Sequence, residues 1–154
     1  MTRPQMQLCE LQARLFESLD RRNVDAKKFI RAFMNSRAAE GLDADYDRMQ
    51  WAGGGYVFED VMDEAGLKVD PACPRYDVDA LFYAGWIYRV WHYLTGETSR
   101  EIYAQADEND ILASYGLHVE ADRLAVEDLK ELARAKRPAH GKMICITTKG
   151  NKTE

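Results

Sequence analysis

An arginine and a histidine lie three positions apart in the most apolar stretch of the sequence, "GWIYRVWHYLTGE" at 85–97. If this stretch is helical, Arg89 and His92 are neighbours, because residues three apart share a helix face. A guanidinium beside an imidazole could hold an anionic group or take part in proton transfer. A buried guanidinium without a partner destabilises a fold by on the order of several kcal/mol. The helix therefore either borders a polar site or receives an acid from another part of the chain.

The first interpretation of Arg89 is structural. The arginine would pair with a core acid and stack on Trp86 or Tyr93, and so organise the packing of helices. The acids nearest in sequence that a packed neighbouring helix could supply lie at 43–47 and 59–64. We predict that the partner of Arg89 comes from one of these two regions.

The second interpretation is functional. Arg89, His92 and nearby tyrosines would line a pocket that binds an anion or the side chain of a partner. In a small helical enzyme, His92 would act as acid or base, Arg89 would hold an anionic group, and Tyr103 or Tyr88 would donate a proton. This alternative requires Arg89 and His92 to face a cleft that is open to solvent.

The sequence predicts no metal site and no cofactor. The alternating aspartates of 43–47 start like a calcium loop, but the positions that need glycine and glutamate hold Arg48 and Gly54. The three histidines are far apart and lack the spacing of ligands on one helix. The triple glycine at 53–55 has neither the preceding strand nor the G-K-[ST] of a phosphate-binding loop. A close helix approach or a helix break is the simpler interpretation of these glycines.

Composition favours a single soluble domain. The chain has 154 residues, of which 46% are hydrophobic and 31% charged, as is typical of one globular unit. Three scattered cysteines exclude a complete disulfide framework and fit a reducing compartment. The N-terminus lacks the apolar region of a secretory signal, and Arg89 and His92 interrupt the only candidate membrane span. We expect a cytoplasmic protein without a membrane partner.

Charge is unevenly distributed along the chain. Residues 43–80 and 97–131 each hold ten acidic and three basic residues, whereas 1–37 and 134–154 are net basic. The simpler interpretation is a solvated mixed surface, and the sharper one is an acidic face that attracts a basic partner. The segment 98–116 has the outline of a helix-turn-helix, but its second helix would open with acids facing phosphates. We therefore predict no nucleic-acid partner.

Apolar residues at steps of three and four predict an all-α fold. We expect one compact domain of six to eight helices around a central aromatic-rich helix at about 78–94. The helical domain spans 1–137, and 138–154 form a basic polar tail that is β-prone or flexible. Longer helices are also expected at 4–20, from Asp25 to Gly41, through 56–62 to Gly66, and at 122–136. Two short helices should begin at Thr98 and at Asp107 or Asn109.

Two stretches, "YDRMQWAGGGYVFEDV" and "GWIYRVWHYLTGETSREIY", together with "YGLH" and "LAVEDLKEL", carry a resemblance. Over residues 30–133 the chain resembles a bacterial family of small, mostly uncharacterised helical proteins. Members of the family often carry acids where this chain has Gly54 and Gly55. The resemblance implies an antitoxin-like component, encoded near candidate toxins that have an ADP-ribosyltransferase-like fold. It implies no catalytic residues.

The sequence therefore favours a protein-binding module, an antitoxin-like protein that binds and neutralises a toxin encoded nearby. The alternative is a small helical enzyme or anion-binding protein with a pocket formed by Arg89, His92 and a tyrosine. Tryptophan, tyrosine and arginine dominate binding hot spots, which makes several side chains candidates for the interface. These partner-binding candidates are Asp47, Arg48, Trp51, Tyr56, Tyr88, Arg89 and His92.

Overall fold

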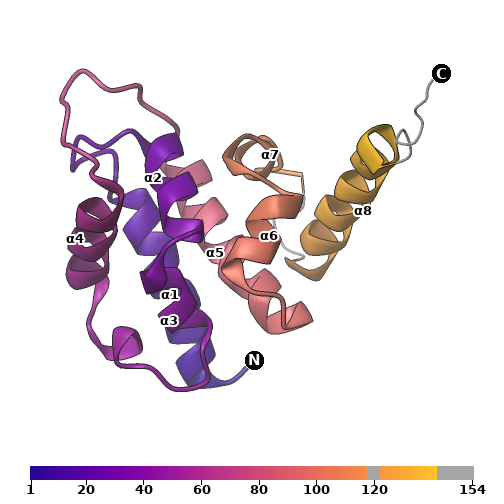
Figure 1. Ribbon diagram of the computed structural model, residues 1–154, viewed down its shortest axis with the longest axis horizontal. Coiled ribbons are helices and arrows are strands. Elements are labelled where there is room, and N and C mark those ends of the chain that lie inside the picture. The colour runs from indigo at the N-terminus through magenta and orange to yellow at the C-terminus, as the bar shows by residue number, and fades with distance from the viewer. Residues whose placement is uncertain (118–121, 142–154) are drawn as a thin grey trace.

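The computed structural model describes residues 1–117 and 122–141, and these residues form eight α-helices, one 3-10 turn and no strand (Figure 1). This confirms the prediction of an all-α fold. The elements are α1 (Arg3–Glu17), α2 (Ala26–Met34), α3 (Arg37–Asp43), the 3-10 turn η1 (Arg48–Trp51), α4 (Gly54–Ala65), α5 (Val78–Thr95), α6 (Ser99–Gln105), α7 (Glu108–Ala113) and α8 (Asp122–Gly141). The β-prone stretch of the tail lies outside the described residues.

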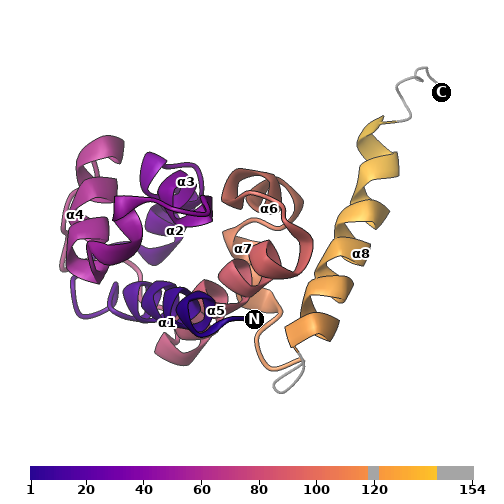
Figure 2. The same cartoon turned by 90° about the horizontal axis from the view of Figure 1, so that it is seen from below.

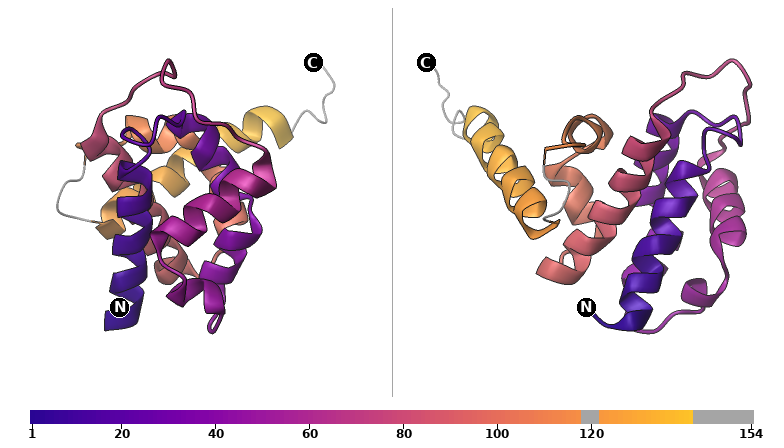
Figure 3. Two further views of the ribbon diagram at one scale, coloured as in Figure 1. Left: turned by 90° about the vertical axis from the view of Figure 1, so that its left-hand side faces the viewer. Right: turned by 180° about the vertical axis from the view of Figure 1, so that it is seen from behind.

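Helices α1 and α5 lie side by side at the centre, with α4 at one end of the molecule and α8 at the other (Figures 2 and 3). Gly85 makes this close pairing possible. A Cβ atom at position 85 would lie 2.5 Å from the carbonyl oxygen of Gln12 and 2.7 Å from the Cα of Ala13. Gly85 therefore lets α1 approach α5 closely.

The ends of α5 and the start of α6 follow from local sequence. Asp77 caps α5 by accepting a hydrogen bond from a backbone N–H of the first turn, and Gly96 ends the helix in the left-handed conformation with φ of 78°. Thr98 and Glu101 then form the predicted capping box at the start of α6. These caps define where α5 ends and where α6 begins. They therefore also define where the polar residues of the two helices face one another.

One expected helix is two helices in the structure. The predicted helix from Asp25 to Gly41 ends at Met34, and Ser36 caps a new helix, α3, by accepting from the N–H of Ala39. Gly41 lies inside α3 instead of after its end. A Cβ at Gly41 would meet the Asp47 carboxylate at 2.9 Å, so this glycine admits the loop before η1. A serine that competes with helical hydrogen bonding explains the break.

The core is built from aromatic and aliphatic side chains of all eight helices. Phe16 is central, because its ring makes edge-to-face contacts with the rings of Phe29, Phe33 and Tyr88. Helix α8 continues past Pro138 to Gly141, beyond the expected end near Lys136.

Candidate functional site

Arg89 is completely buried, with a side-chain exposure of 0%. Its Nη1 donates to Oδ1 of Asp43 at 2.6 Å, its Nε to Oε1 of Gln12 at 2.8 Å, and its Nη2 to Oγ of Ser99 at 3.3 Å. The acid comes from 43–47, one of the two predicted regions, so that prediction is confirmed. The guanidinium is neutralised and hydrogen-bonded on every nitrogen.

The partners of Arg89 are themselves tied to other helices. Asp43, the last residue of α3, also accepts hydrogen bonds from the N–H and the hydroxyl of Ser99, each at 2.8 Å. The amide of Gln12 donates to the carbonyl oxygen of Gly85 at 3.1 Å. We call Gln12, Asp43, Arg89 and Ser99 the Arg89 network. It joins α1, α3, α5 and α6. Because the carboxylate of Asp43 already occupies the position beside Arg89 where an external anion would bind, the network has the geometry of a structural contact that holds these four helices together.

His92 lies at the edge of this network. Its Nδ1 is 2.6 Å from the carbonyl oxygen of Glu97 and 3.8 Å from Oδ1 of Asp43. Because a carbonyl oxygen only accepts, Nδ1 carries the proton and Nε2 is the free ring nitrogen. No described residue is hydrogen-bonded to Nε2. The imidazole ring also contacts the ring of Tyr93 at a centroid distance of 4.9 Å.

A groove of about 610 Å³ runs beside His92, between the start of α1, the loop that follows α3 and the end of α5. Tyr46, His92 and Tyr93 line it, together with the carboxylates of Asp43 and Asp45. Burial raises the pKa of Tyr93. Arg89 does not line the groove, so the groove offers an imidazole and acids without the guanidinium that an anion would need.

Tyr103 belongs to a different network. Its hydroxyl donates to the buried carboxylate of Glu108, and Arg31 donates to both: to the Tyr103 oxygen at 3.1 Å and to Glu108 at 2.8 Å. Burial and the Glu108 hydrogen bond raise the pKa of Tyr103 to about 12. The three residues of the enzyme alternative, His92, Arg89 and Tyr103, are therefore not gathered around one cavity.

The partner-binding candidates differ in exposure, and Asp47 and His92 are partly buried. Tyr88 and Arg89 are buried, and the hydroxyl of Tyr88 donates to the carbonyl oxygen of Ala106 at 2.7 Å. Neither presents a side chain to a partner in the folded chain. By contrast, Arg48 is exposed, and Trp51 and Tyr56 are 75% and 53% exposed.

Hydrogen bonds on its inner side fix the segment that carries Trp51. Asp47 caps η1 by accepting from the N–H of Met49 at 2.8 Å, so its carboxylate turns inward. The side-chain amide of Gln50 donates to the carbonyl oxygens of Ala44 at 2.6 Å and Gly41 at 3.3 Å. These contacts fix the turn and direct the indole outward.

Sequence reasoning missed Tyr46, which is 88% exposed and rims the groove beside His92. A signal was available, because Tyr46 stands between two aspartates in a segment without apolar periodicity. A tyrosine in such a segment is not on the apolar face of a helix and is therefore expected to lie in solvent.

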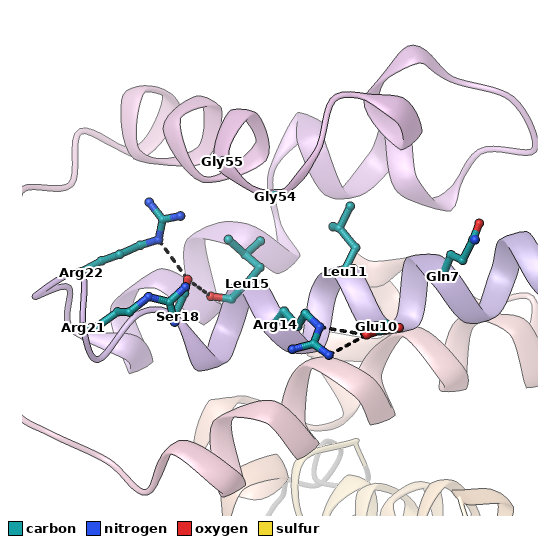
Figure 4. Close-up of a pocket in the computed structure, with 10 residues that line it drawn as sticks. All are labelled: Gln7, Glu10, Leu11, Arg14, Leu15, Ser18, Arg21, Arg22, Gly54 and Gly55. Atoms are coloured by element: carbon teal, nitrogen blue, oxygen red, sulfur yellow. Dashed lines mark hydrogen bonds and ion pairs between the residues drawn. The ribbon is translucent and has the colours of Figure 1, made fainter.

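The triple glycine lies at a hollow of about 390 Å³ between α1 and the start of α4 (Figure 4). Gly53 has φ of 86°, which explains the break before α4, while a Cβ at 54 or 55 would meet nothing within 4 Å. The close helix approach considered for these glycines is absent from this part of the described chain. Arg14 bonds to Glu10, and Arg22 to Ser18, as the dashed lines in Figure 4 mark.

The two acidic blocks differ in how their charges are used. In 97–131, several acids form ion pairs: Glu97 with Lys130, Glu108 with Arg31, Asp110 with Lys136 and Glu131 with Arg134. In 43–80, Asp43 forms the pair with Arg89, and the other acids form no ion pair with the described residues. Among the described residues, most acids of 43–80 are therefore outside ion pairs.

Within the described ranges, no group of three or more histidine, cysteine, aspartate or glutamate side chains could hold a metal ion. Among the same residues, no helix combines the length and the apolarity needed to cross a bilayer. Comparisons of the chain with protein-family models, with curated proteins and with solved structures found no match.

Proposed function

We propose that this chain is a protein-binding module and acts as the antitoxin-like component of a bacterial toxin–antitoxin pair. Its docking surface, called the aromatic surface below, consists of Tyr46, Arg48, Trp51 and Tyr56. The observation that carries the proposal is the exposure of Trp51 on a turn that the chain fixes from behind. The resemblance of residues 30–133 to antitoxin-like proteins supports the second half of the proposal.

The chemistry of the aromatic surface supports an interface. Single exposed apolar residues are common, but here two tyrosines, a tryptophan and an arginine fall within eleven residues of chain. These three residue types dominate the binding energy of protein interfaces. The hydrogen bonds of Gln50 and the cap at Asp47 hold the turn before a partner arrives, which reduces the conformational entropy lost on binding.

The partner that fits this surface is a protein with a basic patch. Helix α4 carries Glu59, Asp60 and Asp63 in addition to Tyr56, and none of these acids forms an ion pair with a described residue. Asp45 lines the groove next to Tyr46 and is also unpaired among the described residues. A lysine or arginine of the partner would enter the groove beside Asp45. Complementary charge of this kind accelerates encounter and selects the partner.

The decisive experiment is co-expression and pull-down with the product of each neighbouring gene. We expect one of these proteins to form a stable complex with the chain and to lose its toxicity. Trp51→Ala should weaken the complex by about 2 kcal/mol or more without changing the fold. Leu132→Ala is the control, because Leu132 is an exposed apolar residue outside the aromatic surface, and it should leave binding unchanged.

A kinetic arm tests the charge argument separately. Raising the salt concentration should slow association more than it speeds dissociation, since steering acts over a Debye length of about 10 Å at 0.1 M salt. Asp63→Lys should reproduce part of that slowing at low salt. If no neighbouring gene product binds or is neutralised, the proposal is wrong.

The alternative of an anion-binding protein or enzyme retains one supporting observation, the free Nε2 of His92 beside the groove. The buried pairing of Arg89 with Asp43 removes the cation that this alternative places in the pocket. Binding of inorganic phosphate that depends on His92 would favour the alternative over the docking proposal.

A further inference from the structure

A second hollow lies on the face of α5 that does not pack on α1. Asp79, Phe82, Tyr83 and Trp86 follow one another at steps of three, one and three, so they share a single face of the helix. All three aromatic side chains are only partly buried. This is unusual for the central helix, whose other face supplies the core.

The opposite wall comes from two residues that follow α7 and from the first residue of α8. Tyr115 lies across from Tyr83, with ring centroids 5.6 Å apart and ring planes tilted by 59°. Gly116 and Asp122 complete the wall, and the enclosed volume is about 410 Å³. Pockets of roughly 300–1,000 Å³ are the size that small ligands occupy.

Hydrogen bonds hold the rings in place. The indole Nε1 of Trp86 donates to Oδ2 of Asp122 at 3.0 Å, and the hydroxyl of Tyr83 lies 3.0 Å from Oγ of Ser114. The rings of Trp86 and Tyr83 are therefore held by hydrogen bonds at their polar edges.

The charge of this hollow has one sign. Among the described residues, its lining includes two carboxylates, Asp79 and Asp122, and no basic side chain. The carboxylate of Asp79 has no hydrogen bond or ion pair with the described residues, whereas one oxygen of Asp122 is used by Trp86. Aromatic faces carry negative electrostatic potential and attract cations. Aromatic rings and acids together favour an organic cation over an anion or a neutral molecule.

We propose that this hollow, which we call the aromatic cage, binds a methylated ammonium group. A quaternary ammonium ion is large, weakly hydrated and apolar at its surface, so it fits aromatic walls while its charge faces the carboxylates. A small metal ion is a poorer match, because it needs several oxygen ligands where the cage has mainly rings. The cage shares no residue with the aromatic surface, so this inference is independent of the proposed docking function.

The test uses the full chain and the indole N–H signals of its three tryptophans in a two-dimensional nitrogen–proton spectrum. Choline is the probe, and the control ligand is its uncharged analogue, in which carbon replaces the ammonium nitrogen. We expect choline to shift the Trp86 signal saturably and to leave those of Trp51 and Trp91 in place. The uncharged analogue should give no saturable shift. Trp86→Phe assigns the signal.

Two variants locate the binding site. Tyr115→Ala removes one aromatic wall at a position that is 41% exposed, and it should weaken choline binding about two- to fivefold. Asp79→Asn should weaken it by a similar factor. Val69→Ala, at an exposed position outside both the cage and the aromatic surface, is the control and should leave the affinity unchanged.

A peptide that contains trimethyllysine distinguishes the source of the ammonium group. Binding at least tenfold tighter than choline indicates a protein side chain, and equal binding indicates a free small molecule. The proposal is overturned if choline gives no saturable shift of Trp86, if the uncharged analogue shifts it equally, or if Tyr115→Ala and Asp79→Asn leave the affinity unchanged.

Discussion

In helix α5 the most apolar stretch of the chain buries an arginine, whereas in the polar stretch 45–56 a tryptophan lies largely in solvent. Arg89 is stable in the core because Asp43, Gln12 and Ser99 together satisfy its charge and its N–H groups. Trp51 lies in solvent on a turn that the hydrogen bonds of Asp47 and Gln50 fix in place. Side-chain type alone is thus a poor guide to burial in either region.

The difference shows what each region contributes. The Arg89 network joins four helices through directional contacts, so it defines how α1, α3, α5 and α6 are placed relative to one another. Polar contacts of this kind stabilise little compared with an apolar core, but they are severely disrupted when one member is lost. The segment 45–56 makes few contacts with the core, which leaves its aromatic side chains available for a partner.

The largest effect should come from Arg89→Met. The substitution leaves the buried carboxylate of Asp43 without its cation, and removing one partner of a buried pair typically destabilises a protein by about 3–5 kcal/mol. Urea unfolding measures the change. Arg14→Met is the matched control, because Arg14 forms an exposed ion pair with Glu10 and should lose less than about 1 kcal/mol. An unchanged unfolding midpoint for Arg89→Met would contradict the stabilising role of the Arg89 network.

The partner of Arg89 illustrates how far the sequence could predict the site. An acid at 43–47 followed from the need to neutralise a guanidinium in an apolar helix, and Asp43 fulfils it. Gln12 and Ser99 could not be foreseen. An amide in an amphipathic helix and a serine in a capping box have ordinary local explanations, and only the packing of α1 and α6 on α5 brings them to Arg89.

The fold was more predictable than the site, because helices and caps depend on local sequence. The start of α6 at Thr98 was predicted from local sequence, whereas the cap that Asp77 forms at the start of α5 was not. The aromatic cage and the free face of α4 arise from tertiary packing, which determines which face of an amphipathic helix stays open. The Ser36 break was predictable in principle but was hidden by continuous apolar periodicity across 29–39.

Gly85→Ala should be the next most damaging change. The new methyl group would lie 2.5 Å from the carbonyl oxygen of Gln12, and neither backbone can move without displacing the Arg89 network. We expect a loss of about 1–3 kcal/mol, as for other overpacked cores. Gly55→Ala is the control, since a Cβ at Gly55 has open space, and it should be neutral or stabilising. Equal midpoints for the two variants would show that α1 and α5 are less closely packed.

A smaller, pH-dependent effect is expected at Glu97, which links α5 to α6 and α8. Burial opposes its ionisation, but hydrogen bonds from Lys130, Trp91 and Gln105 outweigh burial and lower the pKa from 4.5 to about 2. Because the folded-state pKa is the lower one, the contribution of Glu97 is complete above pH 4.5 and is lost as the pH falls toward 2.

Glu97→Gln should therefore destabilise the chain by about 1 kcal/mol near neutral pH, and the difference from the parent protein should shrink between pH 4.5 and 2. Denaturant unfolding at a series of pH values measures this. Lys130→Met removes the cation instead. Stability of this variant should therefore depend less on pH between 4.5 and 2. A difference that stays constant down to pH 2 would mean that the Glu97 contacts do not form in solution.

The smallest effect on stability should come from Trp51→Ala, and its comparison with Trp91→Ala is the sharpest test of the two regions. Trp91 is buried and hydrogen-bonded to Glu97, so its truncation should remove about 3–5 kcal/mol of stability. The indole of Trp51 makes no hydrogen bond with the described residues, and its truncation should change stability by no more than about 0.5 kcal/mol. Thermal unfolding of both variants under one set of conditions measures the contrast. If Trp51→Ala proves as destabilising as Trp91→Ala, the indole belongs to the core, and its exposure no longer supports a docking surface.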